Sequence, residues 1–380
     1  MKTLKQICKK NWYIIATTLL LAVCTTVLTG IMEHNVFPNS FDLFEFAGKS
    51  VLKVAVLVVG VVLSFVITLM FNNKFSVIFA TMFTALTALY SDLFLGFNRT
   101  NGWFYFSLFT AVISLVFYYE NACLDSTGHT VFYYVLLTAL AVAVAVSDEI
   151  EVFIILLTAV IMFAVNRNEI SSKSALMINY VFFVLAIIAS VCLLIEGMDS
   201  YFGIKFIEGD RYHLESLYLS TKSFGVAEYY HRDLEMTSLY NLAKIFRHFG
   251  YVAGIAICVV ITFFALSFFA KCFDNNKKSS PASVLAVIMI SVKCIAGFFE
   301  NFSIISGMRV GIPILSDDIP GYLLVGIMLG FMLVSDEIIN SMVSTFERVF
   351  QRISEKHEVS ETEPDKPHLT LVVSKENDDV

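Results

Sequence analysis

The sequence predicts an all-α, polytopic membrane protein with about ten transmembrane helices. Of its 380 residues, 57% are hydrophobic and only 16% are charged, and the mean hydropathy is +0.74. A soluble domain needs far more polar surface than this composition supplies. The apolar residues also fall into long windows with few or no charges. These windows are close to the roughly 20 residues that a helix needs to cross a bilayer.

Ten such windows follow one another along the chain. They cover residues 11–32, 54–73, 75–91, 100–119, 126–147, 152–166, 174–195, 249–270, 281–308 and 319–335. The sixth window is short, and Asp148, Glu149 and Glu151 stand directly before it. We therefore interpret the fifth and sixth windows as two helices joined by a tight turn. A re-entrant hairpin at this place is the alternative.

Lys and Arg residues in the short loops predict the orientation in the membrane. If the N-terminus is cytoplasmic, most of these cations fall on the inner side, as the positive-inside rule requires. Both termini are then cytoplasmic, and the long loop 197–248 is extracytoplasmic. We expect a membrane domain over 1–341, a cytoplasmic amphipathic helix over 342–357, and a disordered polar tail over 358–380.

Composition also excludes some functions. The net charge of −7 supplies no basic surface for nucleic acid. The seven cysteines lie in or beside apolar windows without a Cys-x-x-Cys motif, which favours packing over metal or disulfide roles. We therefore expect no metal site built from cysteine.

Loop 197–248 is the one long water-facing segment between the windows, and it contains a cluster of titratable residues. Asp233 stands beside His231 and Arg232, with Glu235 close behind. A carboxylate in this setting can act as a general base, and a solvated charged face is the alternative.

Two further groups of charged residues lie in or beside the later windows. Lys293 and Glu300 are seven residues apart inside the ninth window, and so on one helix face. Charges at membrane depth mark either a site or an internal structural pair. Beyond them, Arg309–Gly321 is an irregular segment with two Pro, two Gly and the adjacent acids Asp317 and Asp318. Such backbone is tolerated at membrane depth only where protein or a wet cavity covers it.

Several short motifs occur in a fixed order over residues 130–335. They are Asp148 in Val146–Glu151, Tyr212-His-Leu-Glu-Ser-Leu217, Ser223-Phe-Gly225, Phe249-Gly-Tyr-Val-Ala-Gly254 and Gly311-Ile-Pro-Ile-Leu-Ser316. With the ten-span topology, they resemble the FtsW/RodA (SEDS) family of membrane cell-wall glycosyltransferases. The last motif is similar to the family's Gly-Ile-Pro-Leu-Pro-Phe-Ile-Ser and is the best single match.

This resemblance implies a SEDS-like fold of the GT-C type in the bacterial plasma membrane. It also implies a peptidoglycan glycosyltransferase that polymerises lipid II, the undecaprenyl-linked disaccharide, by inverting transfer. Expected roles are cell shape, division or sporulation, and the expected partner is a single-span class B penicillin-binding protein. No cofactor is implied with certainty, and a divalent cation stays open.

Site residues follow from the same resemblance. His231-Arg-Asp233 reproduces the His-x-Asp of the family's Pro-Glu-x-His-Thr-Asp motif, which assigns Asp233 as the base and Glu235 as the fallback. Lys222, Arg232 and Arg309 would hold the donor pyrophosphate, because cations stabilise a departing phosphate. The full set of expected substrate-binding residues is Asp148, Glu215, Lys222, His231, Arg232, Arg309, Asp317 and Asp318.

Three alternatives stay open. Several family motifs are altered here, with Arg247-His248 in place of Glu-Glu, which favours a catalytically inactive scaffold that binds a cell-wall synthase. An O-antigen or polysaccharide polymerase or ligase also has a large outer loop rich in Arg and His. A transporter would use Lys293 and Glu300, but no repeat of broken helices between the two halves is visible.

Overall fold

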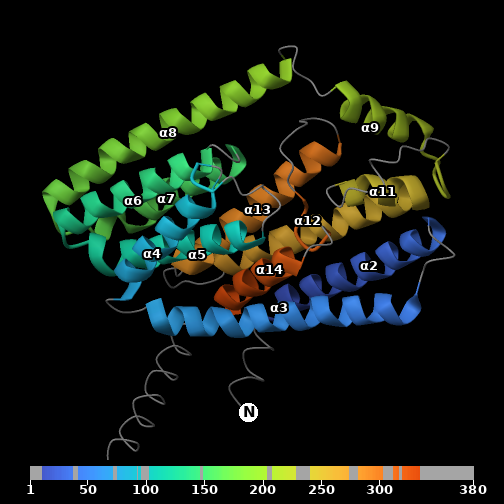
Figure 1. The fold of residues 1–380 in the computed structure, drawn as a ribbon, viewed down its shortest axis with the longest axis horizontal. Coiled ribbons are helices and arrows are strands. Elements are labelled where there is room, and N and C mark those ends of the chain that lie inside the picture. Colours follow the sequence, from blue (N-terminus) through green and yellow to red (C-terminus); the bar gives the residue numbers. More distant parts are fainter. Residues whose placement is uncertain are drawn as a thin grey trace, which may run out of the picture. The chain divides into compact units, whose positions relative to one another are not determined.

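The computed structural model contains helices and no strand in the residues that it describes (Figure 1). These residues are 11–36, 42–71, 75–91, 93–95, 102–145, 149–202, 208–227, 240–273, 281–302, 311–315 and 319–333. The predicted all-α class is therefore confirmed. The amphipathic helix and the tail expected over 342–357 and 358–380 lie outside the described residues, and the boundary at 341 stays a prediction.

One apolar helix overlaps each of the ten predicted windows. Their bounds are α2 (Trp12–Val36), α3 (Leu43–Phe71), α4 (Phe75–Tyr90), α5 (Gly102–Tyr118), α6 (Thr127–Ala145), α7 (Glu149–Asn166), α8 (Lys173–Phe202), α12 (Tyr251–Phe273), α13 (Pro281–Asn301) and α14 (Ile319–Leu333). Eight of them are long and apolar enough to cross a membrane, and α4 and α14 are shorter apolar helices. The polytopic architecture is confirmed, while the orientation in the membrane stays a prediction.

Helices α5 and α13 form the interior of the bundle. In each, 72% of the most apolar window is buried within the protein, compared with 11% for α8. Helix α13 packs against α5, α7, α12 and α14. Polar groups on α13 are therefore enclosed by other helices, whereas α8 presents most of its surface outward.

The close approach of helices α3 and α14 depends on glycine. A Cβ atom on Gly60 would lie 2.5 Å from the carbonyl oxygen of Leu323 and 2.9 Å from the Cα of Gly326. Gly326 and Gly330 are four residues apart on α14, and a Cβ on Gly330 would meet the side chain of Ser64. Small residues at this spacing allow backbones to approach closely, which is how membrane helices gain packing energy without a hydrophobic driving force.

Several buried threonine hydroxyls are satisfied within the helices that carry them. The side chains of Thr18 and Thr25 donate to the carbonyl oxygens four residues earlier, each at 2.7 Å. The pattern lets threonine lie in an apolar interior, where an unpaired hydroxyl would cost several kcal/mol. One further contact joins two helices, because the Oγ1 of Thr17 lies 3.1 Å from the Oγ of Ser267 on α12.

The described part of loop 197–248 includes the amphipathic helices α9 (Glu208–Ser220) and α11 (Asn241–Phe249). Each helix buries an apolar stripe, with Leu214 and Leu217 of α9 and Leu242 and Ile245 of α11 at most 2% exposed. Helix α11 packs against α9 and α12, and Figure 1 shows the three together. Helix α9 ends at Ser220, and Gly225 takes a φ of +89° in the segment that follows.

Candidate functional site

The structure describes four of the residues that the sequence singles out for function. Glu215 and Lys222 are exposed on α9 and in the segment after it, whereas Lys293 and Glu300 lie on α13. The remaining residues of the predicted site, Asp148, His231, Arg232, Asp233, Glu235, Arg309, Asp317 and Asp318, lie outside the described residues. Their roles stay predictions, and the described site is built from their neighbours.

Its centre is an ion pair between two helices. The Nζ of Lys293 on α13 lies 3.0 Å from the Oε1 of Glu151 on α7. Both side chains are enclosed, at 16% and 3% exposure. On the other side, the same Nζ lies 5.2 Å from the ring centre of Phe109 on α5, within the range of a cation–π contact. Three helices thus surround one ammonium group.

The pair lies well inside the bundle. Lys293 is eight residues before the end of α13, which places it about 12 Å below that end. Glu151 is only two residues from the start of α7, so α7 begins level with the middle of α13. The helix N-terminus adds a favourable field for the Glu151 carboxylate. The first turn of α7 is therefore recessed into the protein, while α6 and α7 both keep the length of a membrane span.

This arrangement differs from the pair expected from the sequence. The sequence groups Lys293 with Glu300 because both stand on one face of the same helix, but seven residues separate them by about 10 Å along the axis. The ion pair of Lys293 that the structure shows is with Glu151, a residue that the sequence marks only as part of a turn. Glu300 is 1% exposed and lies about two turns nearer the end of α13.

Asparagines hold the last turn of α13 to the loop helices. The Oδ1 of Asn301 accepts a hydrogen bond of 3.2 Å from the backbone N–H of Ala243 on α11. Its carbonyl oxygen accepts one of 2.9 Å from the hydroxyl of Tyr218 on α9. Asn241 donates to the carbonyl oxygen of Leu315 at 2.7 Å. Because Asn241 and Asn301 are at most 4% exposed, these contacts act as buried clamps above the ion pair.

The clamped segment Gly311–Leu315 carries backbone strain. Residues 312–315 are buried, as expected for irregular backbone at membrane depth. Ile314 has a φ of 68°, a left-handed conformation that is rare for a β-branched residue and costs on the order of 1–3 kcal/mol. The segment also rests on Gly297, where a Cβ would come within 2.5 Å of the Cγ1 of Ile312. Residues 311–315, which belong to the motif most similar to the family's, therefore have a strained backbone that packs against α13.

Residues 221–227 lie directly on the first turn of α12. The backbone N–H groups of Tyr251 and Val252 donate to the carbonyl oxygens of Lys222 and Ser223, at 2.9 and 3.2 Å. Gly250, between α11 and α12, has a φ of +85°, and a Cβ there would lie 2.7 Å from both carbonyl oxygens. Glycine is required at this corner on both counts. The helix-terminal N–H groups are satisfied by the loop.

The basic end of α11 is packed rather than solvated. Arg247 and His248 are 8% and 6% exposed. Burial lowers the pKa of His248 to about 4, and the nearby charges of Arg247 and Lys244 act in the same direction. His248 is therefore neutral at physiological pH. Burial likewise raises the pKa of Tyr218, whose hydroxyl stays protonated and donates to Asn301.

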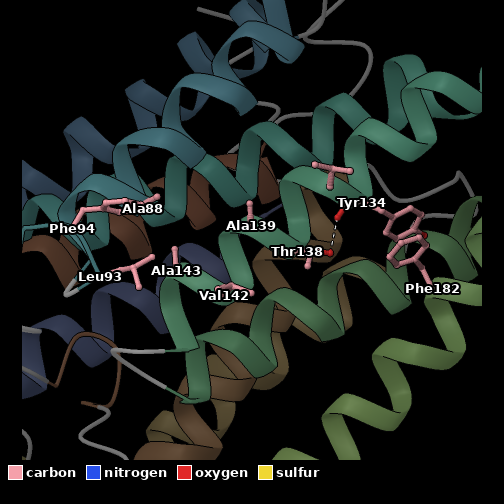
Figure 2. Close-up of a pocket in the computed structure, with 10 residues that line it drawn as sticks. Ala88, Leu93, Phe94, Tyr134, Thr138, Ala139, Val142, Ala143 and Phe182 are labelled. Carbon is pink, nitrogen blue, oxygen red and sulfur yellow. Dashed lines mark hydrogen bonds between the residues drawn. The ribbon is translucent and has the colours of Figure 1, made fainter.

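An apolar groove of about 550 Å³ lies along α6, bounded by α4 and α8 (Figure 2). Ala88, Leu93 and Phe94 line one end, and Tyr134 and Phe182 the other, with Thr138, Ala139, Val142 and Ala143 between them. Tyr134 and Phe182 stack with ring centres 4.0 Å apart. The hydroxyl of Thr138 is turned to the carbonyl oxygen of Tyr134 at 2.7 Å, which leaves an apolar lining. The size is that of a small-molecule site.

Sequence reasoning missed a second polar cluster, at the groove's aromatic end. The hydroxyls of Tyr119 and Tyr134 both donate to the Oδ1 of Asn179, each at 2.7 Å. Asn179 donates in turn to the carbonyl oxygen of Ala175 at 2.8 Å. The sequence signal for this cluster is the polar Asn179 within the apolar window 174–195. In the part of the chain that the structure describes, no three His, Cys, Asp or Glu side chains come close enough to hold a metal ion.

The fold defines the chain as a multi-pass α-helical membrane protein. No family model matches it, and no curated protein matches its sequence. Its fold is similar to a chain of a solved structure described as "Structural coordination of polymerization and crosslinking by a peptidoglycan synthase complex". The TM-score is 0.54 at 13% identity, over 85% of this chain and 96% of that chain. This likeness agrees with the expected SEDS-like fold, and membership of the family stays a prediction.

Proposed function

We propose that the chain is a membrane glycosyltransferase of cell-wall synthesis that polymerises a polyprenyl-diphosphate-linked disaccharide, lipid II, in the bacterial plasma membrane. The observation that carries the proposal is the likeness of fold to a chain of a peptidoglycan synthase complex over 96% of that chain. The order of the sequence motifs supports it independently. On the same grounds we propose a single-span class B penicillin-binding protein as the partner, and roles in cell shape, division or sporulation.

In the proposed reaction, Asp233 removes the proton of the acceptor hydroxyl. The acceptor oxygen forms a bond to the anomeric carbon of the donor, and the bond between that carbon and the diphosphate oxygen breaks. Polyprenyl diphosphate leaves with the electron pair, and the configuration at the carbon is inverted. Lys222, Arg232 and Arg309 would stabilise the departing diphosphate, because cations aimed at developing negative charge lower the barrier. Glu235 is the fallback base.

The groove along α6 offers a place for the lipid tail. Its lining is apolar, and its volume of about 550 Å³ suits part of a flexible prenyl chain. Helix α8 is largely outward-facing and bounds the groove, so we propose that a membrane lipid enters from this side.

The Glu151–Lys293 pair would supply the positive charge at the inner end of the site. A buried ion pair contributes little net stability, so its presence at membrane depth favours a functional role. In the resting protein, Glu151 neutralises Lys293 at 3.0 Å. An approaching diphosphate would compete with that carboxylate for the ammonium group. We propose that Lys293 orients the diphosphate and that Glu151 holds Lys293 in place beforehand.

A non-catalytic scaffold is the second candidate, and one observation favours it. Arg247 and His248 stand where the family has two glutamates, and both are buried, at 8% and 6% exposure. Basic side chains packed in this way contribute to the loop's fold rather than to proton transfer. The scaffold would bind a cell-wall synthase through the same bundle without joining sugars.

Polymerisation of labelled lipid II by the purified chain, alone and with a class B penicillin-binding protein, separates the two candidates. We expect glycan strands from the wild type, no strands from Asp233→Ala, and wild-type yield from Asp199→Ala, which removes another acid of the same loop. Activity that survives Asp233→Ala would overturn the assignment of the base. Binding of lipid II without any product would favour the scaffold.

A further inference from the structure

Three apolar side chains project from the water-facing loop beside α12. Leu219, Phe224 and Val226, here named the loop patch, are 89%, 71% and 51% exposed. Large apolar residues at such exposure are costly in water when they lie together, and they mark an interaction surface. Their neighbours Leu214 and Leu217 are buried, so the amphipathic stripe of α9 is already used for packing.

The loop patch is held beside the end of a membrane-spanning helix that carries an outward-facing apolar stripe. On α12, Val252, Ile255, Val259, Phe263 and Leu266 are each 46–59% exposed. Their spacing of three or four residues places them on one face of the helix. The window Tyr251–Cys272 has the hydropathy of a membrane span, so this exposed face is the lipid-facing one. Residues 222 and 223, which lie between Leu219 and Phe224 in the chain, are bonded to the first turn of this helix.

Backbone hydrogen bonds fix the loop to this helix end. Lys222 and Ser223 accept from the first N–H groups of α12, and the N–H of Ala227 donates to the carbonyl oxygen of Arg247 at 2.7 Å. The hydroxyl of Tyr251 donates to the carbonyl oxygen of Tyr218 at 2.7 Å. Residues 221–227 therefore cannot swing away from α12 without loss of these bonds.

Helix length places the loop at the boundary of the membrane. The 23 residues of α12 span about 34 Å, slightly more than the roughly 30 Å of a hydrocarbon core. Its first turn accordingly lies in the interfacial zone, where aromatic side chains and lysine are favoured. Phe224 and the exposed Lys222 have this chemistry, since a lysine stem can lie along lipid while its ammonium reaches the headgroups.

We propose that the loop patch inserts into the adjacent membrane leaflet and anchors the long loop to the lipid surface. The partner is the boundary between acyl chains and headgroups rather than another protein. Anchoring would hold α9, and with it the Tyr218–Asn301 contact, at a set height above the end of α13. The inference is independent of sugar transfer and applies equally to an enzyme and to a scaffold.

Tryptophan fluorescence tests the proposal in the intact chain. Phe224→Trp is made in a background in which Trp12 and Trp103 are replaced by Phe, and the protein is placed in nanodiscs of phosphatidylcholine and phosphatidylglycerol. We expect lipids brominated near the headgroup to reduce the emission about twofold, as for an interfacial aromatic residue. Iodide in the water phase is expected to have little effect.

Glu215→Trp in the same background is the matched control, because Glu215 is exposed one helical turn before Leu219. We expect iodide to quench it and brominated lipid to affect it much less. Unfolding curves check that each variant keeps its fold. If the emission of the Phe224→Trp variant responds to iodide and not to brominated lipid, the loop patch faces water and the proposal fails. Protection of that variant from iodide only when a partner protein is added would also overturn the proposal, in favour of protein docking.

Discussion

The ion pair between Glu151 and Lys293 yields a prediction that separates an internal structural contact from a solvated one. Glu151→Gln and Lys293→Met each remove one charge and leave the other enclosed. Losing one partner of a buried pair costs about 3–5 kcal/mol, because the remaining charge is uncompensated, whereas removing both is close to neutral. At 16% exposure Lys293 keeps some solvent contact. We therefore expect the lower part of that range, about 3 kcal/mol for each single variant.

The double variant distinguishes an internal ion pair from two charges that are solvated independently. If the charges compensate each other, Glu151→Gln with Lys293→Met is destabilised by about 1–2 kcal/mol rather than the sum of about 6, which gives a coupling of several kcal/mol. The free energy of unfolding is measured in mixed micelles with rising SDS, in parallel for the four proteins. Additive effects, with a coupling below about 0.5 kcal/mol, would refute the pairing. Lys293→Arg, which keeps the charge, serves as the control and should retain most of the stability.

Two further predictions concern stability. Gly60→Ala should lower the free energy of unfolding by about 1–3 kcal/mol, because its Cβ would press on the backbone of α14. The control Gly48→Ala on the same helix has no heavy atom within 4 Å of the added carbon, and it should raise the free energy of unfolding by about 0.5–1 kcal/mol. Equal effects of the two substitutions would contradict the close approach of α3 and α14. His248 stays neutral in the folded state down to about pH 4, while the unfolded chain binds a proton below its ordinary pKa of 6.5. The free energy of unfolding should therefore fall by at most about 3 kcal/mol as the pH drops from 6.5 to 4, and it should level off below pH 4. His248→Gln should flatten this dependence of stability on pH. An unchanged dependence in that variant would show that other groups cause it.

The sequence predicted the membrane bundle well because the signal is simple. Windows such as 174–195 and 249–270 are long, apolar and free of charge, or nearly so, and each became one helix. The spacing of Leu214 and Leu217 and of Leu242 and Ile245 is a similar local signal, and these side chains are buried on α9 and α11. In each case the hydrophobic pattern is set by a single helix and by the surroundings of that helix alone.

The site was harder to predict, because its contacts join residues far apart in the chain. Nothing local connects Glu151 with Lys293, and helical spacing drew attention to Glu300 instead. The clamp between Asn301 and Ala243 likewise appears only once α11 lies over the end of α13. Helix ends also shift with tertiary context: α13 stops at Asn301, seven residues before its apolar window ends, and the buried segment at 311–315 lies against it.

The most direct measurement of the central proposal is the release of polyprenyl diphosphate from lipid II by the purified wild-type chain in lipid nanodiscs. Each sugar transfer frees one leaving group, so the assay reports the chemical step even when the polymer is short. If the chain is a glycosyltransferase, release should accompany the joining of disaccharides, and Asp233→Ala should abolish both. Absence of release by a folded protein that binds lipid II, in reactions where an independent polymerase is active, would contradict the proposal.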